Sequence, residues 1–362
     1  MQKKEDDVIE VSKDVDKYKF IKQSSYGARC FPTKCEFKSS FYDKIISGEM
    51  KYEELKQHPN QYVIFSDVSS LYPASMCYSG FDENKNFIEA EYGSGMSRWS
   101  EDGLKEFTDG KIGFYSIEYT CTNKKLRVAI LPRYSKSTEC LVWSLEDGDG
   151  IYSSIDIKIA IENGYENTFG KCLVYDSTSN HFKNYVSIFS KLKQEAEIEE
   201  NPVQRGVCKL SMNALYGKCL QRAIITKTTI VQNLGDKLAF MEIRTLTDCA
   251  IIDNKNLILT GTIKNISEQC KAQTKPVQLG SLILSYSRKI MLEYTKFLSP
   301  KLDTMPFNYT DTDSLHILGT ECNRLIEAGY YIENKKNAKL GYLTNDLKNN
   351  GLVFHEVAVS PK

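Results

Sequence analysis

The sequence predicts an α+β protein, and three observations support this class. Extended runs rich in apolar, aromatic and β-branched residues lie at 61–72, 111–135 and 307–318. Longer runs with a helical period lie between them. No internal repeat or low-complexity segment is apparent in the 362 residues. A chain of this length can bury a substantial core and form more than one domain.

The first predicted strand, QYVIFSDVSSLY at 61–72, carries an acidic residue near its end. In an extended strand Val63, Phe65 and Asp67 share one face, so Asp67 would emerge at the carboxyl end beside buried apolar residues. A lone Asp after a strand is more often a turn former or a helix N-cap, and this alternative stays open for Asp67 taken alone.

Two further strands, KIGFYSIEYT and LRVAILPRY, are predicted within 111–135 around a polar turn at 122–125. Helices are predicted at 153–163, 181–200, 202–222 and 277–298. The last of them repeats an apolar residue every three or four positions, at Leu279, Leu282, Tyr286, Ile290, Tyr294 and Phe297. Residues 1–20 are charge-rich, and we expect a mobile arm or the start of a truncated unit there.

Composition limits the classes of function. Lys and Arg total 47, as do Asp and Glu, so any nucleic-acid surface must be local. The 11 cysteines are scattered without a CxxC pair, which favours free thiols in a reducing compartment over a zinc site. The charged N-terminus lacks an apolar signal core, and no run reaches the roughly 18 apolar residues of a membrane helix. We therefore expect an intracellular, soluble protein with no membrane partner.

The stretch KLSMNALYGK, at 209–218, predicts a binding face on a helix. Lys209, Asn213 and Tyr216 form one stripe, with Gly217 beside it. The Lys209 ammonium can bind a phosphate, and the Tyr216 ring can stack on a base. Gly217 has no side chain and allows a ligand to approach the helix closely. The alternative is a solvated helix face. Other directions of the helix, which can face the core, carry Leu210, Met212 and Leu215.

The stretch FNYTDTDSLHI, at 307–317, places two acids close together. In extended conformation Asp311 and Asp313 share a face with Tyr309, and their charges repel. A divalent cation would neutralise them, and Mg²⁺ favours a few carboxylates together with substrate phosphates. The alternative is a solvated turn, since Asp-Thr-Asp-Ser is favourable turn chemistry.

Taken together, DVSSLYP, KLSMNALYG and YTDTDS resemble, in this order, motifs A (DxxSLYP), B (KxxxNxxYG) and C (YxDTDS) of the family B DNA polymerases. No fixed position departs from the three patterns. The resemblance implies a polymerase palm, an antiparallel sheet with packed helices, together with helical fingers. The matching residues are Asp67, Ser70, Leu71, Tyr72, Pro73, Lys209, Asn213, Tyr216, Gly217, Tyr309, Asp311, Thr312, Asp313 and Ser314.

The resemblance also implies catalytic roles for the acids. Family members use two Mg²⁺ ions about 4 Å apart, or Mn²⁺ in their place, to activate the primer hydroxyl and stabilise the leaving pyrophosphate. Asp67 and Asp313 would bridge the ions, and the carbonyl of Val68 would complete one metal shell. Asp311 would lie close enough to tune the site.

The nucleotide would be held from the fingers. Lys209 would reach the triphosphate as a point charge. A second lysine is expected from the preceding helix, where its place favours Lys193 over Lys191. The alternative, a solvated helix face on which these lysines pair with Glu195 and Glu197, stays open.

The remaining motif residues would contact the base pair and the sugar. Asn213 and Tyr216 would line the nascent base pair, with Gly217 leaving room for the template. The ring of Tyr72 would pack beneath the incoming sugar, where a 2′-hydroxyl collides with it, and Pro73 would fix the backbone that aims the ring.

A finer resemblance is to the protein-primed branch of the family. The segment 81–180 resembles in position the insertion that embraces the terminal protein primer, and 223–274 the second insertion of that branch. SYGARCFP resembles the YxG(G/A) element that contacts template DNA. The residues expected to contact DNA are Tyr26, Gly27, Arg29, Gly217 and Tyr309.

The domain organisation follows from these matches. We expect an N-terminal segment with the YxG(G/A)-like element at 1–60, palm with motif A at 61–80 and a first insertion at 81–180. We then expect fingers with motif B at 181–222, a second insertion at 223–274 and palm with motif C at 275–362. The stretch before Tyr26 leaves no room for a proofreading exonuclease. VAVSPK resembles the start of the KxY motif, with Lys362 as its lysine, so the thumb is expected to be missing.

The sequence thus predicts a DNA-directed DNA polymerase core that adds deoxynucleotides to a primer, in protein-primed replication of a viral, plasmid or transposon-like linear genome. Its partners would be template-primer DNA, deoxynucleoside triphosphates and a terminal protein. The alternative is a non-catalytic palm-like remnant that binds DNA or a terminal protein. Basic residues gather locally at Lys183, Lys191, Lys193, Arg205, Lys209, Lys218 and Arg222.

Overall fold

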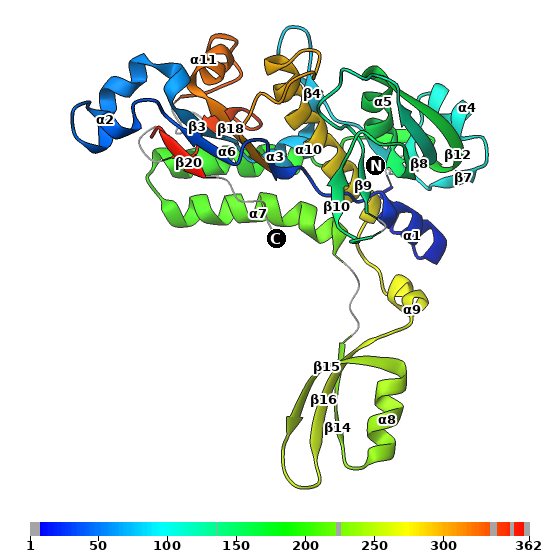
Figure 1. The fold of residues 1–362 in the computed structure, drawn as a ribbon. Coiled ribbons are helices and arrows are strands. Elements are labelled where there is room, and N and C mark those ends of the chain that lie inside the picture. The colour runs from blue at the N-terminus through cyan, green and yellow to red at the C-terminus, as the bar shows by residue number, and fades with distance from the viewer. Residues whose placement is uncertain (1–7, 136, 222–225, 334–338, 348–350, 358–362) are drawn as a thin grey trace.

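The computed structural model describes residues 8–135, 137–221, 226–333, 339–347 and 351–357. Helices and antiparallel sheets build a broad upper body, from which a small lobe projects (Figure 1). The α+β prediction is confirmed. None of the helices described is long and apolar enough to span a lipid bilayer. Two residues considered above, Arg222 and Lys362, lie outside the described ranges.

A five-stranded antiparallel sheet forms the centre of the body, in the order β1-β17-β18-β3-β19. Its strands are β1 Cys30–Pro32, β17 Tyr309–Asp311, β18 Ser314–Leu318, β3 Val63–Val68 and β19 Leu343–Asn345. One hydrophobic core lies against it, with Ile64, Leu315 and Ile317 contributed by the sheet. Segments about 280 residues apart in the chain are therefore neighbours in this sheet.

Short elements border this sheet. Helix α11 contacts β3 and β18, and β2 pairs with β20. These bordering elements are α11 Gly319–Glu327, α2 Tyr42–Ile46, the 3₁₀ turns η2 Tyr52–Gln57 and η3 Pro59–Gln61, β2 Glu36–Lys38 and β20 His355–Val357.

A second sheet, in the order β11-β8-β12-β7, occupies most of the predicted first insertion. Its strands are β7 Arg98–Ser100, β8 Ile112–Cys121, β11 Gly148–Ser153 and β12 Tyr165–Tyr175. Helix α5 Ser154–Glu162 covers the buried face of this sheet. It confirms the helix predicted at 153–163. The other elements of this part are β4 Tyr78–Phe81, β5 Phe87–Glu89, β6 Tyr92–Ser94, α4 Gly103–Thr108, β9 Pro132–Tyr134, β10 Leu141–Trp143 and β13 Ser177–Ser179.

The strand predicted for LRVAILPRY is mostly wrong. Only β9 is extended and paired there, while the residues before it form irregular backbone. Leu126, Val128 and Ile130 are buried in the core beneath the second sheet. Instead of pairing with a neighbouring strand, Arg127 N donates a hydrogen bond to Leu302 O at 2.8 Å. The apolar alternation therefore marked a buried segment and not a strand.

Two long helices form a hairpin beside the central sheet. These are α6 Lys183–Ile198 and α7 Pro202–Leu220. Asn201 caps α7 by accepting a hydrogen bond from Gln204 N, and Pro202 follows in the first turn, where its missing N–H costs nothing. Met212 is buried, but Leu210 is 69% exposed, so the expectation that Leu210 faces the core is wrong. Of these two residues, Met212 alone lies on the face of α7 that packs against the core.

The projecting lobe corresponds to most of the predicted second insertion. Its three-stranded sheet has the order β14-β16-β15 and is packed against α8. The elements are β14 Thr226–Val231, α8 Leu234–Ile243, β15 Arg244–Ile251 and β16 Leu257–Ile263, followed by α9 Ile266–Lys271.

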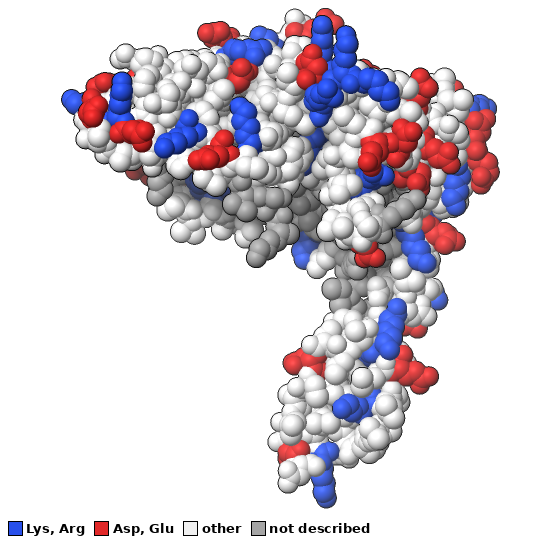
Figure 2. Space-filling view, viewed as in Figure 1, with Lys and Arg blue, Asp and Glu red and all other residues white. Residues whose placement is uncertain are grey.

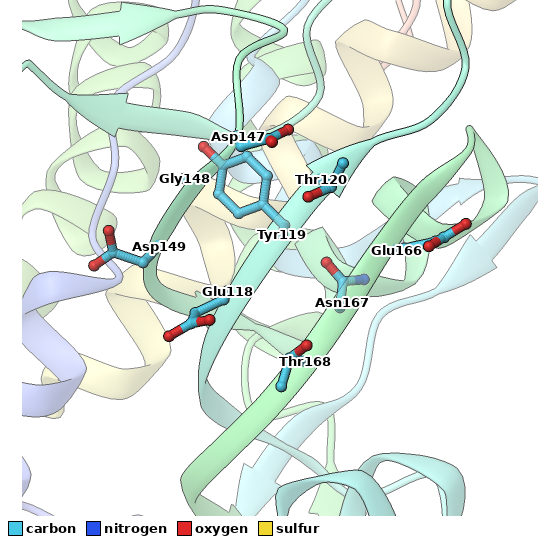
Figure 3. Close-up of a pocket in the computed structure, with 9 residues that line it drawn as sticks. All are labelled: Glu118, Tyr119, Thr120, Asp147, Gly148, Asp149, Glu166, Asn167 and Thr168. Carbon is cyan, nitrogen blue, oxygen red and sulfur yellow. The ribbon is translucent and has the colours of Figure 1, made fainter.

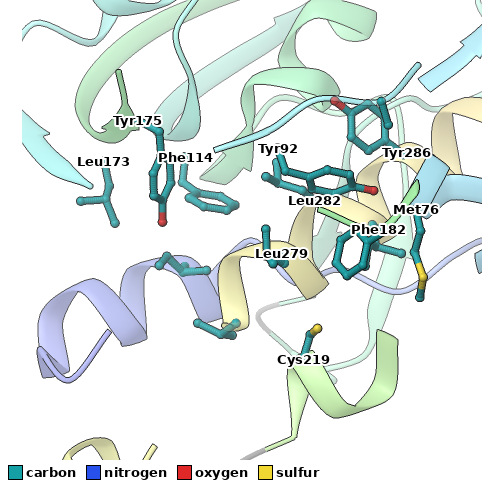
Figure 4. Close-up of a cluster of buried hydrophobic side chains, with 14 of the residues drawn as sticks. Met76, Tyr92, Phe114, Leu173, Tyr175, Phe182, Cys219, Leu279, Leu282 and Tyr286 are labelled. Atoms are coloured by element: carbon teal, nitrogen blue, oxygen red, sulfur yellow. The ribbon is translucent and has the colours of Figure 1, made fainter. Parts of the chain in front are cut away.

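Helix α10 Val277–Leu298, predicted with the same bounds, joins the cores of the body. The residues of α10 that are not buried are Lys289, Glu293, Lys296 and Phe297. Figure 4 shows one core, where Tyr92 lies edge-on against Phe182 and Tyr286 with ring centroids 5.1 and 5.5 Å apart. The apolar period predicted one buried face, but neighbours on every side bury nearly the whole helix.

The expectation of a mobile arm at 1–20 is wrong for the part that the structure describes. Helix α1 Val15–Gln23 begins there, capped by Asp14. Phe20 and Ile21 are buried in the same core as Leu279 and Leu282 of α10. Apolar positions within a charged segment thus anchor it to the body.

Candidate active site

The two acids of YTDTDS lie in a tight turn between β17 and β18. Asp311 pairs with Ser314, and Asp313 N donates to Asp311 O at 2.6 Å. Thr312 has a φ of 55°, which reverses the chain. The expectation that both acids share one face of an extended strand is therefore wrong. The turn alternative describes the backbone correctly.

The turn brings Asp313 next to Asp67. Strand β18 pairs with β3 so that Ser314 lies opposite Asp67. Val68 N donates to Asp313 O at 2.8 Å, which ties the end of β3 to the turn. The backbone positions of the three acids thus lie at the same end of β3, β17 and β18, next to Val68.

The surroundings of Asp313 at this end of the sheet disfavour the charged form of its carboxyl group. Burial, and then the neighbouring Asp311, raise the pKa of Asp313, while Lys209 acts in the opposite direction. Asp313 consequently holds a proton to higher pH than an exposed aspartate. A cation bound here would reduce the repulsion between Asp313 and Asp311.

The donor set fits a divalent metal by its chemistry. Carboxylate and carbonyl oxygens are the ligands that Mg²⁺ prefers, and Asp67, Asp313 and Val68 supply them. As they stand, no three Asp, Glu, His or Cys side chains in the described ranges are gathered closely enough to hold an ion. The assignment of Asp67, Val68 and Asp313 as ligands therefore stays a prediction.

The chain turns sharply after Val68. Ser70 has a φ of 56°, and α3 Leu71–Cys77 begins directly after it. The strand predicted to continue to residue 72 is wrong beyond Val68, because this turn starts a helix. Pro73 lies in its first turn, where proline is tolerated since those N–H groups lack intrahelical partners.

The turn into α3 places Tyr72 against α7. Its ring stacks on Tyr216 of α7, with centroids 3.9 Å apart and planes 15° apart. Burial raises the pKa of Tyr72, and Tyr216 adds to the shift. The two predicted nucleotide-binding tyrosines, 144 positions apart in the sequence, therefore form one stacked pair.

A pocket of about 100 Å³ opens between the sheet and the helical hairpin. Lys193 and Lys209 both line it, together with Asp67. Lys191 does not line the pocket; its side chain is 79% exposed and lies 3.9 Å from Glu195. This geometry favours Lys193 in the choice that the sequence left open. The lining residues are Asp67, Ser69, Ser70, Ser190, Lys193, Gln194, Glu197, Arg205, Lys209, Met212, Leu340, Thr344 and Asp346.

Three charged residues of this pocket were not predicted as site residues. Arg205 and Glu197 lie one helical turn from Lys209 and Lys193, so helical spacing from the two lysines was the available signal. Asp346 carried no such signal. Its position depends on the pairing of β19 with β3 and on Asp346 N donating to Phe65 O at 2.8 Å.

The YxG(G/A)-like element is hydrogen-bonded to the turn between β17 and β18. Arg29 O accepts a hydrogen bond from Thr312 N at 2.9 Å. The Arg29 guanidinium donates to Ala129 O at 2.7 Å and lies over the Trp143 ring. Tyr26 is buried and stacks on Tyr152 with centroids 5.0 Å apart. Both side chains are engaged within the protein, so template contact by this element stays a prediction.

The other predicted DNA-contacting residues differ in accessibility. Gly27 and Gly217 are exposed, and a Cβ added to Gly217 would meet nothing within 4 Å. Tyr309 is half-buried, its hydroxyl 3.5 Å from Cys30 Sγ. Asn213 is half-buried on α7, between Lys209 and Tyr216. Open space above Gly217 is compatible with the predicted passage of a template.

A second, acidic pocket lies on the β11-β8-β12-β7 sheet. It holds about 470 Å³ and is lined by parts of β8, β11 and β12 (Figure 3). Glu118 and Asp149 are direct cross-strand partners, as are Glu166 and Thr120. Like charges opposite each other destabilise a sheet, so this face favours a cationic partner. Figure 2 shows acidic side chains gathered over this part of the body.

Comparisons with known proteins identify the family of the chain. A family model described as DNA polymerase type B, organellar and viral, matches residues 48–299. A DNA polymerase of Kluyveromyces lactis is 27% identical over 269 residues, which are 70% of this chain and 24% of that protein. A DNA polymerase of Streptococcus phage Cp-1 is 23% identical over 338 residues, 88% of this chain and 51% of that protein.

Solved structures show the same fold. The Phi29 DNA polymerase complexed with primer-template DNA and incoming nucleotide substrates aligns with a TM-score of 0.59 and 16% identity, covering 96% of this chain and 50% of that one. Its orthorhombic crystal form aligns with a TM-score of 0.58 and 15% identity, covering 98% and 55%. The chain spans at most about half of the curated relatives. Because the family model covers most of it, the chain belongs to the type B DNA polymerases of the organellar and viral kind.

Proposed function

We propose that this chain is the palm-and-fingers core of a DNA-directed DNA polymerase. The central sheet is its palm, and α6 with α7 its fingers. The observation that carries the proposal is the pocket in which Asp67, Lys193 and Lys209 meet next to the Asp313 turn. Acids at the end of a sheet, facing cations on a helical hairpin, suit the transfer of a nucleotide to a primer hydroxyl.

The basic and acidic residues of the pocket have different roles. Lys193 and Lys209 bind the triphosphate oxygens and orient the substrate over the acids. Asp67 and Asp313, with the Val68 carbonyl, would hold divalent ions, Mg²⁺ or Mn²⁺. When bound, such ions activate the primer hydroxyl and neutralise the charge that develops on the leaving pyrophosphate.

The stacked pair selects the substrate. Tyr72 and Tyr216 present a flat, half-buried surface between α3 and α7. A deoxyribose can pack on the Tyr72 ring, whereas a 2′-hydroxyl would collide with it. Asn213, on the same stripe of α7, faces the nascent base pair.

For the primer, we favour a terminal protein. The acidic face carrying Glu118, Asp149 and Glu166 repels phosphate, so the first insertion suits a basic protein partner better than DNA. Template-primer DNA would then occupy the side of Gly217. Such priming fits replication of a viral, plasmid or transposon-like linear genome.

Primer extension by the full chain tests the polymerase proposal. With Mg²⁺, template-primer DNA and each nucleotide type, we expect extension with deoxynucleotides, and no extension by Asp313→Asn. The same reaction with a candidate terminal protein and labelled dATP reports label on a protein hydroxyl. The alternative, a palm-like remnant that only binds DNA or a terminal protein, is supported if DNA is bound but no condition extends it.

A further inference from the structure

A row of three rings crosses the face of the central sheet that is turned away from its hydrophobic core. His316 of β18 lies directly opposite Tyr309 of β17 and Phe65 of β3. Its ring stacks on Phe65, with centroids 3.8 Å and planes 11° apart, and is tilted against Tyr309 at 4.9 Å. Asp67 follows Phe65 by two residues, and Asp311 follows Tyr309 in the same way. Each of these acids therefore shares a strand face with one ring of the row.

Glu356 of β20 holds the middle ring of the row. Nδ1 of His316 is hydrogen-bonded to Oε1 of Glu356, and the two side chains are 16% and 7% exposed. An ionised carboxylate only accepts hydrogen bonds, so Nδ1 donates. Because the χ2 torsion of histidine is roughly two-fold, this hydrogen bond selects one of two orientations of the ring.

Folding alone does not explain Glu356. Its second carboxylate oxygen, Oε2, is buried and has no hydrogen-bond partner within the described ranges. A buried oxygen of this kind lowers the free energy of unfolding. Strand β20 does not need it as an anchor, because β20 pairs with β2 and Phe354 packs against the core of the central sheet. The position of Glu356 therefore calls for a role other than stability.

Resting on the proposed function, we infer that Glu356 and His316 are positioning residues for nucleotide transfer. Glu356 fixes the orientation of the His316 ring, and this ring holds β3 and β17 at the spacing that their acids require. Misplacing reacting groups by about 1 Å can lower a rate by about a hundredfold, so contacts within the row can control kcat. In this role neither residue has to touch the substrate.

The test is the steady-state kinetics of primer extension by the full chain with Mg²⁺, together with thermal unfolding. Glu356→Leu lowers kcat by about tenfold and changes the KM for dATP by less than about twofold, because the acids shift while the pocket lysines do not. Its Tm stays close to that of the wild type, since the lost hydrogen bond and the removed unpaired oxygen offset each other. Glu356→Gln, whose amide oxygen still accepts from Nδ1, retains most of the kcat.

Glu36→Leu is the matched control. Nε2 of His355 and Oε1 of Glu36 are 3.1 Å apart, so the sheet of β2 and β20 carries a second histidine–glutamate pair. His355 and Glu356 are neighbours on β20 and point to opposite sides of it. The kcat of Glu36→Leu stays that of the wild type. A loss equal to that of Glu356→Leu would overturn the inference, since a disturbance of β20 would then explain both.

A double variant tests whether Glu356 acts through the ring. The background His316→Phe keeps a ring for stacking but has no nitrogen to bind a carboxylate. In this background Glu356→Leu causes no further loss of kcat, because its effect on the acids passes through His316.

Imidazole NMR gives a readout that is independent of activity. The chain has only four histidines, so their ring signals can be assigned one by one. The proton on Nδ1 of His316 is observed in the wild type and in Glu356→Gln, and it is lost in Glu356→Leu, because the hydrogen bond sets the tautomer.

Three results would overturn the inference while the wild type still extends a primer. These are an unchanged kcat in Glu356→Leu, an undiminished loss of kcat in the His316→Phe background, and an Nδ1 proton that persists in Glu356→Leu. A fall in Tm much larger than that of Glu36→Leu would overturn it too, by assigning Glu356 to folding. A wild-type chain that extends no primer overturns the proposed function as well.

Discussion

Two places in the molecule bring an arginine and a carboxylate together, and they differ in what surrounds the pair. Arg288 of α10 and Asp156 of α5 meet at 2.7 Å with both side chains only 4% exposed. Asp156 also accepts hydrogen bonds from the Ser153 and Ser285 hydroxyls, and Arg288 donates to Tyr26 O. This buried pair is closed by neighbours on every side.

The pair of Arg205 and Glu197 is open. It is partly exposed, lines a pocket, and lies beside Lys209 and Asp67. Buried charges must be fully hydrogen-bonded to persist, whereas half-exposed ones can exchange partners at low cost. The closed network therefore joins α5 to α10 and to the backbone of Tyr26, whereas the open pair can be reached from the pocket. Four predictions test this difference.

The largest effect is expected at the acids of the open site. Asp313→Asn removes the negative charge that would hold a divalent ion and lowers the rate of primer extension by about a thousandfold or more. Asp109→Asn, on the surface of the first insertion, is the control and retains the wild-type rate. Near-normal incorporation by Asp313→Asn would show that the palm acids are not the catalytic ones.

The next effect concerns the closed pair. Arg288→Met leaves Asp156 buried without its cation and lowers the free energy of unfolding by about 3–5 kcal/mol. Urea denaturation followed by circular dichroism measures it. The double variant Arg288→Met with Asp156→Leu is expected to recover part of the loss, because no charge is then left unpaired. A loss below about 1 kcal/mol would contradict the closed network.

A smaller effect is expected on substrate choice. Tyr72→Val removes the ring under the sugar, so the ratio of kcat/KM for deoxynucleotides over ribonucleotides falls by about 10- to 100-fold. Tyr216→Phe keeps the stack and is the control, with the ratio unchanged. Unchanged discrimination in Tyr72→Val would remove this role from Tyr72 without affecting the assignment of the acids.

The smallest effect is expected at an exposed pair on α6. Lys191→Ala changes the free energy of unfolding by less than about 0.5 kcal/mol and leaves the KM for dATP unchanged, since Lys191 and Glu195 are exposed and outside the pocket. Lys193→Ala, two positions along the same helix, raises that KM by about tenfold. Equal effects of the two substitutions would show that α6 binds nucleotide through its general positive charge.

Sequence patterns predicted the helices well where they are long. The bounds of α10 agreed with the apolar period, and α7 begins at Pro202, where the helix at 202–222 was predicted to begin. Short strands were predicted less well. The segment 126–131 alternates like a strand but is buried without pairing, and the strand at 61–72 stops where Ser70 adopts a left-handed backbone.

By itself, the sequence determined the chemistry of the site: the acids, lysines and tyrosines of three motifs, each readable because neighbouring residues carry a local pattern. Only the tertiary structure decided which of them meet. The β18–β3 register places Asp313 beside Asp67, the α6–α7 hairpin selects Lys193 and adds Arg205 and Glu197, and β19 brings in Asp346. These encounters depend on strand pairing and helix packing between distant segments, which leave no periodic trace in the chain.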